Sequence, residues 1–271
     1  MPLELDTRQR AMLQEMGVPV WLPEPAALVP EAPARPMPAQ RPQPPRQAAP
    51  VVAPSDKAVS THAAAPQGPG AVPEASSLGD WDALHAAVQH CRACKQCSGR
   101  LHATLVPPAS AQPCDWMVVG DPPDAEEDQA GAPFAGADGV LLDNMLRALD
   151  ASAAYRSNVL KCRTNHGAVP QATELAQCSA YLQREIALVR PKVILAMGRF
   201  AHQVLLSETP EAAGLPLGRL RGQVYRYQGV AVVLTYAPKQ LMRNSADKAK
   251  AWADLCLAAA TREAAGQAAP G

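Results

Sequence analysis

Met117-Val118-Val119-Gly120-Asp121 is a short apolar run that ends at a glycine and a carboxylate, a pattern that predicts a buried β-strand. Residues 157–160 form a second strand candidate, and residues 192–197 form the clearest one. Segments with helical spacing of their apolar residues separate these runs. Strands that alternate with helices favour an α/β layered fold around a mostly parallel sheet.

The rest of the chain extends this alternation. Helices are expected at residues 81–90, 140–149, 174–189, 199–206 and 246–260, and strands at residues 219–227 and 230–236. Ligands of such folds gather beyond the carboxyl ends of the strands. Asp121, Asn158 and Ala237 each follow a strand or end one, so the functional site is expected at that edge.

Composition divides the 271 residues into a tail and one domain. Most of the 28 prolines precede residue 75, among Ala, Gln and Val. Such a segment cannot bury enough apolar surface to offset its ordering entropy. We therefore expect a short helical segment at 1–22, a disordered linker at 23–77, one domain at 78–262 and a disordered tail at 263–271.

Charge and hydropathy limit the function classes. The formal net charge is zero, so a nucleic-acid surface has to be local. No apolar stretch approaches the roughly 20 residues that span a bilayer, and no secretory signal is evident. A cytoplasmic, nucleoid-associated bacterial protein without a membrane partner is expected, and a monomer.

Four of the seven cysteines have the spacing of ligands: Cys91 and Cys94 form a C-x2-C pair, and Cys162 and Cys178 are separated by fifteen residues. Thiolates grouped in this way hold a metal centre that joins segments remote in sequence. A reducing compartment makes a disulfide framework a poor explanation. The spacing alone leaves zinc open, and buried apolar cysteines are the alternative without a metal.

Further motifs occur in order around these cysteines. They are Gly120-Asp121-Pro122-Pro123-Asp124, Ala132-Pro133-Phe134-Ala135-Gly136, Asn158-Val159-Leu160-Lys161-Cys162-Arg163 and Thr235-Tyr236-Ala237-Pro238-Lys239-Gln240-Leu241-Met242-Arg243. This ordered set resembles the family 4 uracil-DNA glycosylases, a bacterial and archaeal branch that carries an iron–sulfur cluster.

The resemblance implies a three-layer α/β/α sandwich with a central, mostly parallel four-stranded sheet. It also implies a [4Fe–4S] cluster held by Cys91, Cys94, Cys162 and Cys178, with a structural role. Cys97 extends the C-x2-C pair to a third cysteine, but the family pattern does not use that position.

A glycosylase takes its base out of the DNA stack and reads the Watson–Crick edge in a pocket. That pocket needs an aromatic platform and an amide that pairs with uracil, and Phe134 and Asn158 fit these two roles. Gly120 belongs to the same predicted substrate site. The alternatives are an ordinary core aromatic for Phe134 and a strand-end turn residue for Asn158.

The sequence departs from the family pattern at the residues that are expected to carry out the reaction. Asp121 stands where the family has a glutamate, so the predicted catalytic carboxylate is shorter by one methylene. Ala237 stands where the family has the histidine of a His-Pro-Ser motif, which stabilises the departing uracil. The loop after the third cysteine also differs, at Asn165-His166-Gly167-Ala168. Losing one preorganised donor costs on the order of 100- to 1,000-fold in rate.

Three function hypotheses follow. The leading one is an enzyme of base excision repair that hydrolyses the N-glycosidic bond of uracil in DNA, with reduced or altered activity; Phe134, Asn158 and Asp121 favour it. The second is a DNA-binding paralogue that keeps the cluster and scaffold without turnover, and Ala237 favours it. The third is a zinc-stapled domain with no DNA role.

Basic residues around the last motif are the candidates for DNA contact. Lys239 and Arg243 fit contacts to phosphates on either side of a flipped nucleotide. Lys248 and Lys250 fit a solvated helix face equally well.

The N-terminal segment carries a separate prediction. Residues 7–16 have the pattern of a short helix that ends at Gly17, and Trp21 follows. Residues 13–21 faintly resemble the opening peptide of the psi subunit of the bacterial clamp loader, which docks on its chi partner. Residues 6–22 are therefore a candidate docking peptide for a replication or repair protein, and a helix folded back on the domain is the alternative.

Overall fold

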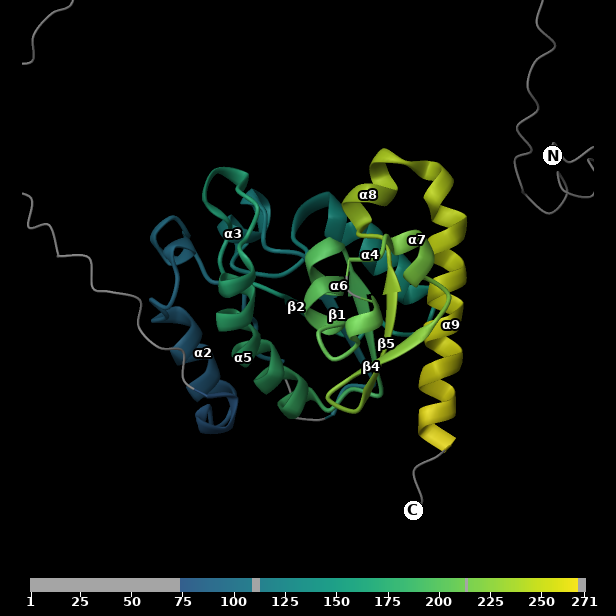
Figure 1. Ribbon diagram of the computed structural model, residues 1–271, viewed down its shortest axis with the longest axis horizontal. Helices are drawn as coiled ribbons and strands as arrows, with labels where there is room; N and C mark the ends of the chain where they lie inside the picture. Colours follow the sequence, from purple (N-terminus) through teal and green to yellow (C-terminus); the bar gives the residue numbers. More distant parts are fainter. Residues whose placement is uncertain (1–73, 109–112, 213, 268–271) are drawn as a thin grey trace, which may run out of the picture. The chain divides into compact units, whose positions relative to one another are not determined.

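A computed structural model of the chain describes residues 74–108, 113–212 and 214–267 (Figure 1). Its sheet has five strands in the order β2-β1-β3-β5-β4. Their bounds are β1 Trp116–Gly120, β2 Tyr155–Asn158, β3 Val193–Met197, β4 Val224–Tyr227 and β5 Val230–Thr235. The first four in this order run parallel, and β4 pairs antiparallel with β5 at the edge. The mostly parallel α/β sheet is confirmed.

The number of strands corrects the expectation of four. The fifth strand is β4, the first arm of the hairpin that turns at Gln228-Gly229. The segment predicted as one strand at 219–227 begins as a helix, α7 Leu217–Leu220, and only its second half is extended. Because β4 pairs on one side only, three of its four side chains remain at least partly exposed, which is typical of an edge strand.

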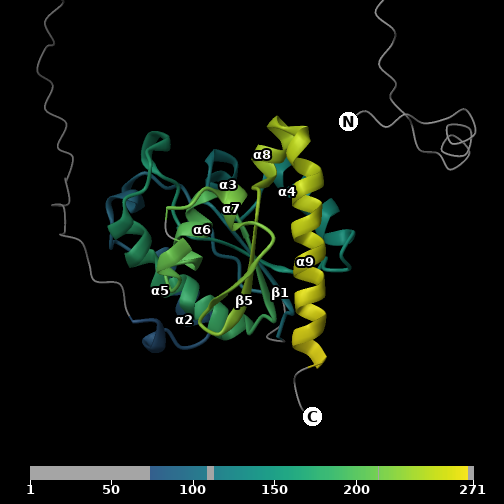
Figure 2. The same cartoon turned by 45° about the vertical axis from the view of Figure 1, so that its right-hand side comes forward.

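Helices cover both faces of the sheet, as Figures 1 and 2 show. On one face, Val119, Ala196 and Leu234 pack with residues of α5 (Ala172–Val189) and α6 (Arg199–Leu205). On the other, Val118, Leu195 and Val233 pack with α4 (Gly136–Arg147) and α9 (Lys248–Gln267). Adjacent residues of a strand face opposite sides, so each strand contributes to both cores. The three-layer arrangement is confirmed.

Four further helices complete the helical elements of the described residues. They are α2 Trp81–Gln89, α3 Ala125–Ala130, α7 and α8 Pro238–Arg243. Five 3-10 turns complete the described elements: Ala75–Ser77, Lys95–Ser98, Asn165–Gly167, Pro210–Ala212 and Ser245–Asp247. The sequence pattern missed α3 and α8, which are one to two turns long and show no apolar period.

The domain limits differ from the expected ones at the carboxyl end. The helix α9 continues to Gln267, so residues 263–267, expected in a disordered tail, are helical. The predicted segment 1–22 and all but the last four residues of the predicted linker lie outside the described residues. Within the part of the chain that is described, no helix is long and apolar enough to cross a membrane.

Candidate base-binding site and cysteine cluster

The predicted site residues meet at one edge of the sheet. Gly120 lies opposite Asn158 on one side and Met197 on the other, and Met197 lies opposite Thr235. The carboxyl ends of β2, β1, β3 and β5 therefore form one row. Asp121 follows the last residue of β1 directly, and Ala237 lies two residues after the end of β5. The structure therefore brings together at this edge the segments that the sequence predicted to lie there.

Glu127 organises this edge, and the sequence analysis missed it. Asp124 and Glu127 form a capping box at the start of α3. One carboxylate oxygen of Glu127 accepts the backbone N–H of Asp124 at 2.8 Å. The other, Oε1, accepts the N–H of Phe134 at 2.6 Å and the side-chain amide of Asn158 at 3.0 Å. The spacing of the capping box, Asp-x-x-Glu, was the available signal.

The amide of Asn158 is held in one orientation. Its Nδ2 donates to the carbonyl of Asp121 at 2.9 Å and to Glu127, which uses both of its N–H bonds. Its Oδ1 is buried and has no hydrogen-bond partner among the described residues. Since buried polar atoms are nearly always paired, this acceptor fits a ligand that brings an N–H donor.

Phe134 lies against the end of β1. A Cβ atom added at Gly120 would stand 2.6 Å from Cζ of the Phe134 ring, so only glycine permits this contact. Phe134 itself has a positive φ of 55°, which costs a non-glycine residue of order 1–3 kcal/mol. The ring is partly exposed although it packs on the core below. A strained, partly exposed aromatic ring therefore lies over the end of β1.

The carboxylate of Asp121 faces the beginning of α6. Its Oδ1 accepts the backbone N–H groups of Phe200 at 2.7 Å and Ala201 at 3.1 Å, and Oδ2 accepts that of Arg199 at 3.2 Å. A Cβ atom at Gly198 would stand 2.4 Å from Asp121 Cγ, so glycine is required there. Burial raises the pKa of Asp121 above its usual value, although these N–H groups lower it.

A cavity of about 460 Å³ opens beside these residues. It is lined by residues 122–126, Arg163, Thr164, Gly167 and Lys239. Lys239 bridges its mouth with an ion pair to Asp124 at 3.0 Å. Burial tends to raise the pKa of Asp124. The backbone N–H of Glu127 and the ammonium of Lys239 donate hydrogen bonds to its carboxylate and together hold the pKa below its usual value.

The last motif contributes little chemistry of its own. Ala237 precedes α8, and its methyl group has no donor for a leaving group. Arg243 ends α8 and is exposed, as is Lys239. The two predicted DNA contacts therefore share a short helix on the surface.

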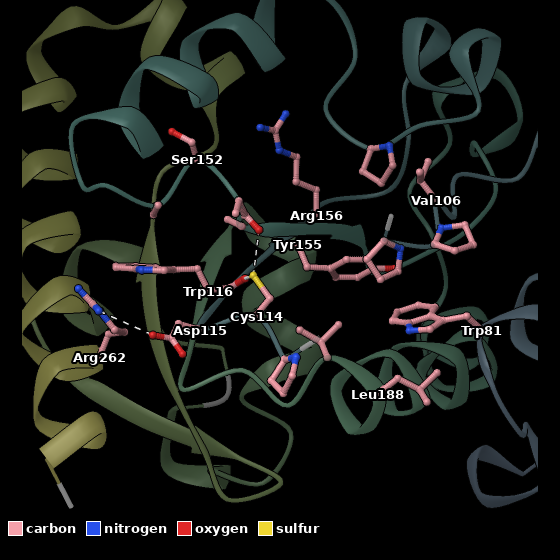
Figure 3. Close-up of a pocket in the computed structure, with 18 of the residues that line it drawn as sticks. Trp81, Val106, Cys114, Asp115, Trp116, Ser152, Tyr155, Arg156, Leu188 and Arg262 are labelled. Atoms are coloured by element: carbon pink, nitrogen blue, oxygen red, sulfur yellow. Dashed lines mark hydrogen bonds and ion pairs between the residues drawn. The ribbon is translucent and has the colours of Figure 1, made fainter. Parts of the chain in front are cut away.

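A second, larger cavity of about 870 Å³ lies at the amino ends of the strands (Figure 3). Trp81, Trp116 and Tyr155 line it, and Arg262 and Asp115 form an ion pair across part of its rim. Cys114 donates its S–H to the carbonyl of Ala153 there. None of the predicted site residues lines this cavity.

The four predicted cysteine ligands come from three separate elements. Cys91 and Cys94 follow α2, Cys162 follows β2, and Cys178 lies within α5. Burial raises the pKa of Cys162 to about 11, and Cys94 and Cys91 raise it as well. Burial likewise raises the pKa of Cys178 to about 12, with Cys162 and Cys91 contributing. The fold thus places these thiols within electrostatic reach of one another.

A charged hydrogen-bond donor accompanies these thiols. Arg100 Nη1 donates to Cys162 Sγ at 3.0 Å. Donors to sulfur stabilise thiolates and are characteristic of iron–sulfur sites, so the residues fit a cluster.

One buried side chain ties the cysteine loop to the cavity. Gln96 donates to both carboxylate oxygens of Glu174 at 3.0 and 3.1 Å, and its own carbonyl accepts the N–H of Asn165 at 2.8 Å. Across the described segments, no three His, Cys, Asp or Glu side chains are arranged to hold a single metal ion. A [4Fe–4S] cluster is larger than one ion, and the thiolates around it are correspondingly further apart.

Comparison with known proteins agrees with this geometry. A family model described as the uracil DNA glycosylase superfamily matches residues 107–256. A type-4 uracil-DNA glycosylase of Pyrobaculum aerophilum is 33% identical over 184 residues, which are 66% of this chain and 92% of that protein. The enzyme of the same name from Archaeoglobus fulgidus is 32% identical over 170 residues, 59% of this chain and 84% of that protein. The enzyme of the same name from Sulfurisphaera tokodaii is 30% identical over 171 residues, which are 60% of this chain and 77% of that protein.

The fold and site define an α/β protein in which Glu127 joins the side chain of Asn158 to the backbone of Phe134 at the carboxyl edge of the sheet. The chain belongs to the uracil-DNA glycosylase superfamily and, within it, to the type-4 family.

Proposed function

We propose that the protein is a uracil-DNA glycosylase of base excision repair, which hydrolyses the N-glycosidic bond of uracil in DNA. The observation that carries this proposal is the buried Oδ1 of Asn158, which has no hydrogen-bond partner in the part of the chain that the structure describes. Uracil presents an N–H donor at ring position 3, which this acceptor would bind. Cytosine presents a lone pair at the same position, so two acceptors would face each other and cytosine would be rejected.

Base recognition combines this acceptor with stacking. Phe134 would stack on the flipped base, as aromatic side chains do in such pockets. Glu127 holds the amide of Asn158 and the backbone of Phe134 at once, so the platform and the acceptor keep a fixed relation. Preorganisation of this kind places the base before the bond breaks.

In the reaction, water adds across the bond between C1′ of the sugar and N1 of uracil, which leaves free uracil and an abasic site. Positive charge develops on the sugar, and the carboxylate of Asp121 is the group we assign to stabilise it. Its three backbone hydrogen bonds hold it in one orientation. Ala237 offers no donor to the departing uracil, so we expect a slow enzyme.

We assign a [4Fe–4S] cluster to Cys91, Cys94, Cys162 and Cys178, because the relatives are type-4 enzymes and the donor set fits. A bound cluster would supply a rigid link between α2, the loop after β2 and α5, and no chemistry on the base. Through Gln96 and Asn165 that link would also set the loop that lines the smaller cavity.

DNA is the proposed partner, with Lys239 and Arg243 as phosphate contacts from α8. A phosphate would have to compete with Asp124 for Lys239, whose side chain is 52% exposed. We also propose that residues 6–22 dock on a replication or repair protein. A peptide of residues 1–25 should capture purified clamp-loader chi subunit, and Trp21→Ala should abolish that capture. Protection of this segment from proteolysis in the isolated protein would contradict the docking proposal.

The direct test is release of base from oligonucleotides that differ only in carrying uracil, thymine or cytosine. We expect measurable release of uracil, none of cytosine, and a large loss with Asp121→Asn. The names of the relatives favour this enzyme over a binding protein without turnover. DNA binding without release of uracil, by the protein and by Ala237→His alike, would support the binding protein instead.

A further inference from the structure

Arg100 links two of the segments that carry the cysteines. It follows the 3-10 turn Lys95–Ser98, and its guanidinium is about half buried. Nη1 donates to Cys162 Sγ at 3.0 Å, and Nη2 donates to the carbonyl of Gln89, the last residue of α2. One planar side chain therefore fixes the end of the helix that leads to Cys91 and the thiol of Cys162.

The charge of Arg100 is matched to its surroundings. Its Nη1 lies 3.0 Å from Cys162 Sγ, so a cation directly contacts one of the assigned ligands. Four thiolate ligands give a [4Fe–4S] site a net negative charge, which a buried cation would offset. Hydrogen bonds to the sulfurs and local charge are among the factors that set the potential of such clusters.

We propose that Arg100 is a positioning residue of the cysteine site, which holds Cys162 as a thiolate ligand and raises the reduction potential of the cluster; this rests on the proposed function. The hydrogen bond is charge-assisted, so it favours the thiolate over the thiol. Lysine is a point charge and cannot make both contacts in the same planar geometry. The role is therefore specific to arginine.

A purely mechanical role predicts a different result. If Arg100 only tied α2 to the loop after β2, its loss would loosen the site but leave the potential of the remaining clusters unchanged. If it acts on Cys162 through charge and hydrogen bonding, its loss lowers the potential as well.

The experiment uses full-length protein purified without oxygen, as wild type, Arg100→Gln, Arg100→Lys and Arg92→Gln. Arg92 is exposed between Cys91 and Cys94 and serves as a control that removes the same charge. Iron content, the rate of cluster loss in air and the reduction potential are measured for each, with circular dichroism to confirm folding. Arg100→Gln should lower the potential and weaken metal retention on the order of 10- to 100-fold, Arg100→Lys should lie between, and the control should match wild type.

Wild-type potential and retention in Arg100→Gln would overturn the proposal while leaving the cluster assignment intact. Faster loss of iron at an unchanged potential would reduce Arg100 to a mechanical tie and overturn the electrostatic role. Wild-type protein without iron would overturn the cluster assignment, and this proposal with it. If Arg100→Gln fails to fold, an unchanged potential in Arg100→Lys refutes the proposal.

Discussion

Replacing Glu127 by alanine should impair uracil excision without unfolding the protein. The change removes the acceptor for three N–H groups, from Asp124, Phe134 and Asn158. A buried donor left unpaired costs about 1–3 kcal/mol. Asn158 and Phe134 are then no longer held in position for the reaction. If this raises the activation free energy by about 1.4–2.7 kcal/mol, excision slows about 10- to 100-fold.

The assay is single-turnover release of uracil from a labelled oligonucleotide, with enzyme in excess so that chemistry is observed. Gln129→Ala is the matched control, because Gln129 is exposed on the same helix, lines neither cavity and takes no part in these bonds. Both variants are also made in an Ala237→His background, where we expect faster excision and hence a clearer signal. Equal rates for Glu127→Ala and Gln129→Ala, with thermal unfolding unchanged, would show that Glu127 does not position Asn158 and Phe134 for excision.

Three further predictions concern the same edge. Ala237→His should raise the single-turnover rate by on the order of 100-fold, because it restores a donor to the leaving group; no gain would show that another group already does this. Gly120→Ala should displace the Phe134 ring at a cost of about 1–3 kcal/mol and weaken uracil-DNA binding in a fluorescence titration. Gly218→Ala is the control and should not weaken binding, because a Cβ atom there meets no described residue within 4 Å. Burial raises the pKa of Asp121 above the usual aspartate value, and the reaction needs the ionised carboxylate. The excision rate should therefore fall as the pH drops through this raised pKa. A rate that stays constant down to the usual aspartate pKa would contradict this.

Apolar patterning predicted the parts of the fold that packing controls. The strands β1 and β3, Trp116–Gly120 and Val193–Met197, are buried throughout, so their apolar composition alone identified them. The strand expected at 219–227 failed in its first half because Leu220 faces the core from a short helix, a contact that strand propensity does not report.

The candidate site was predictable in its positions but not in its contacts. Strand ends placed Asn158 and Asp121 together, since parallel strands share an edge. The role of Glu127 depends on where its carboxylate points after α3 forms, and the pairing of Lys239 with Asp124 joins residues 115 positions apart. Such contacts arise from tertiary structure, so sequence spacing could not supply them.

We propose that the buried Oδ1 of Asn158 accepts the ring N–H of uracil. Single-turnover release of uracil is compared with that of 3-methyluracil, which lacks this donor, from otherwise identical oligonucleotides. We expect release of uracil, and release at least about 10-fold slower for the methylated base, because the buried acceptor is then left unpaired. Equal rates for the two bases would contradict it.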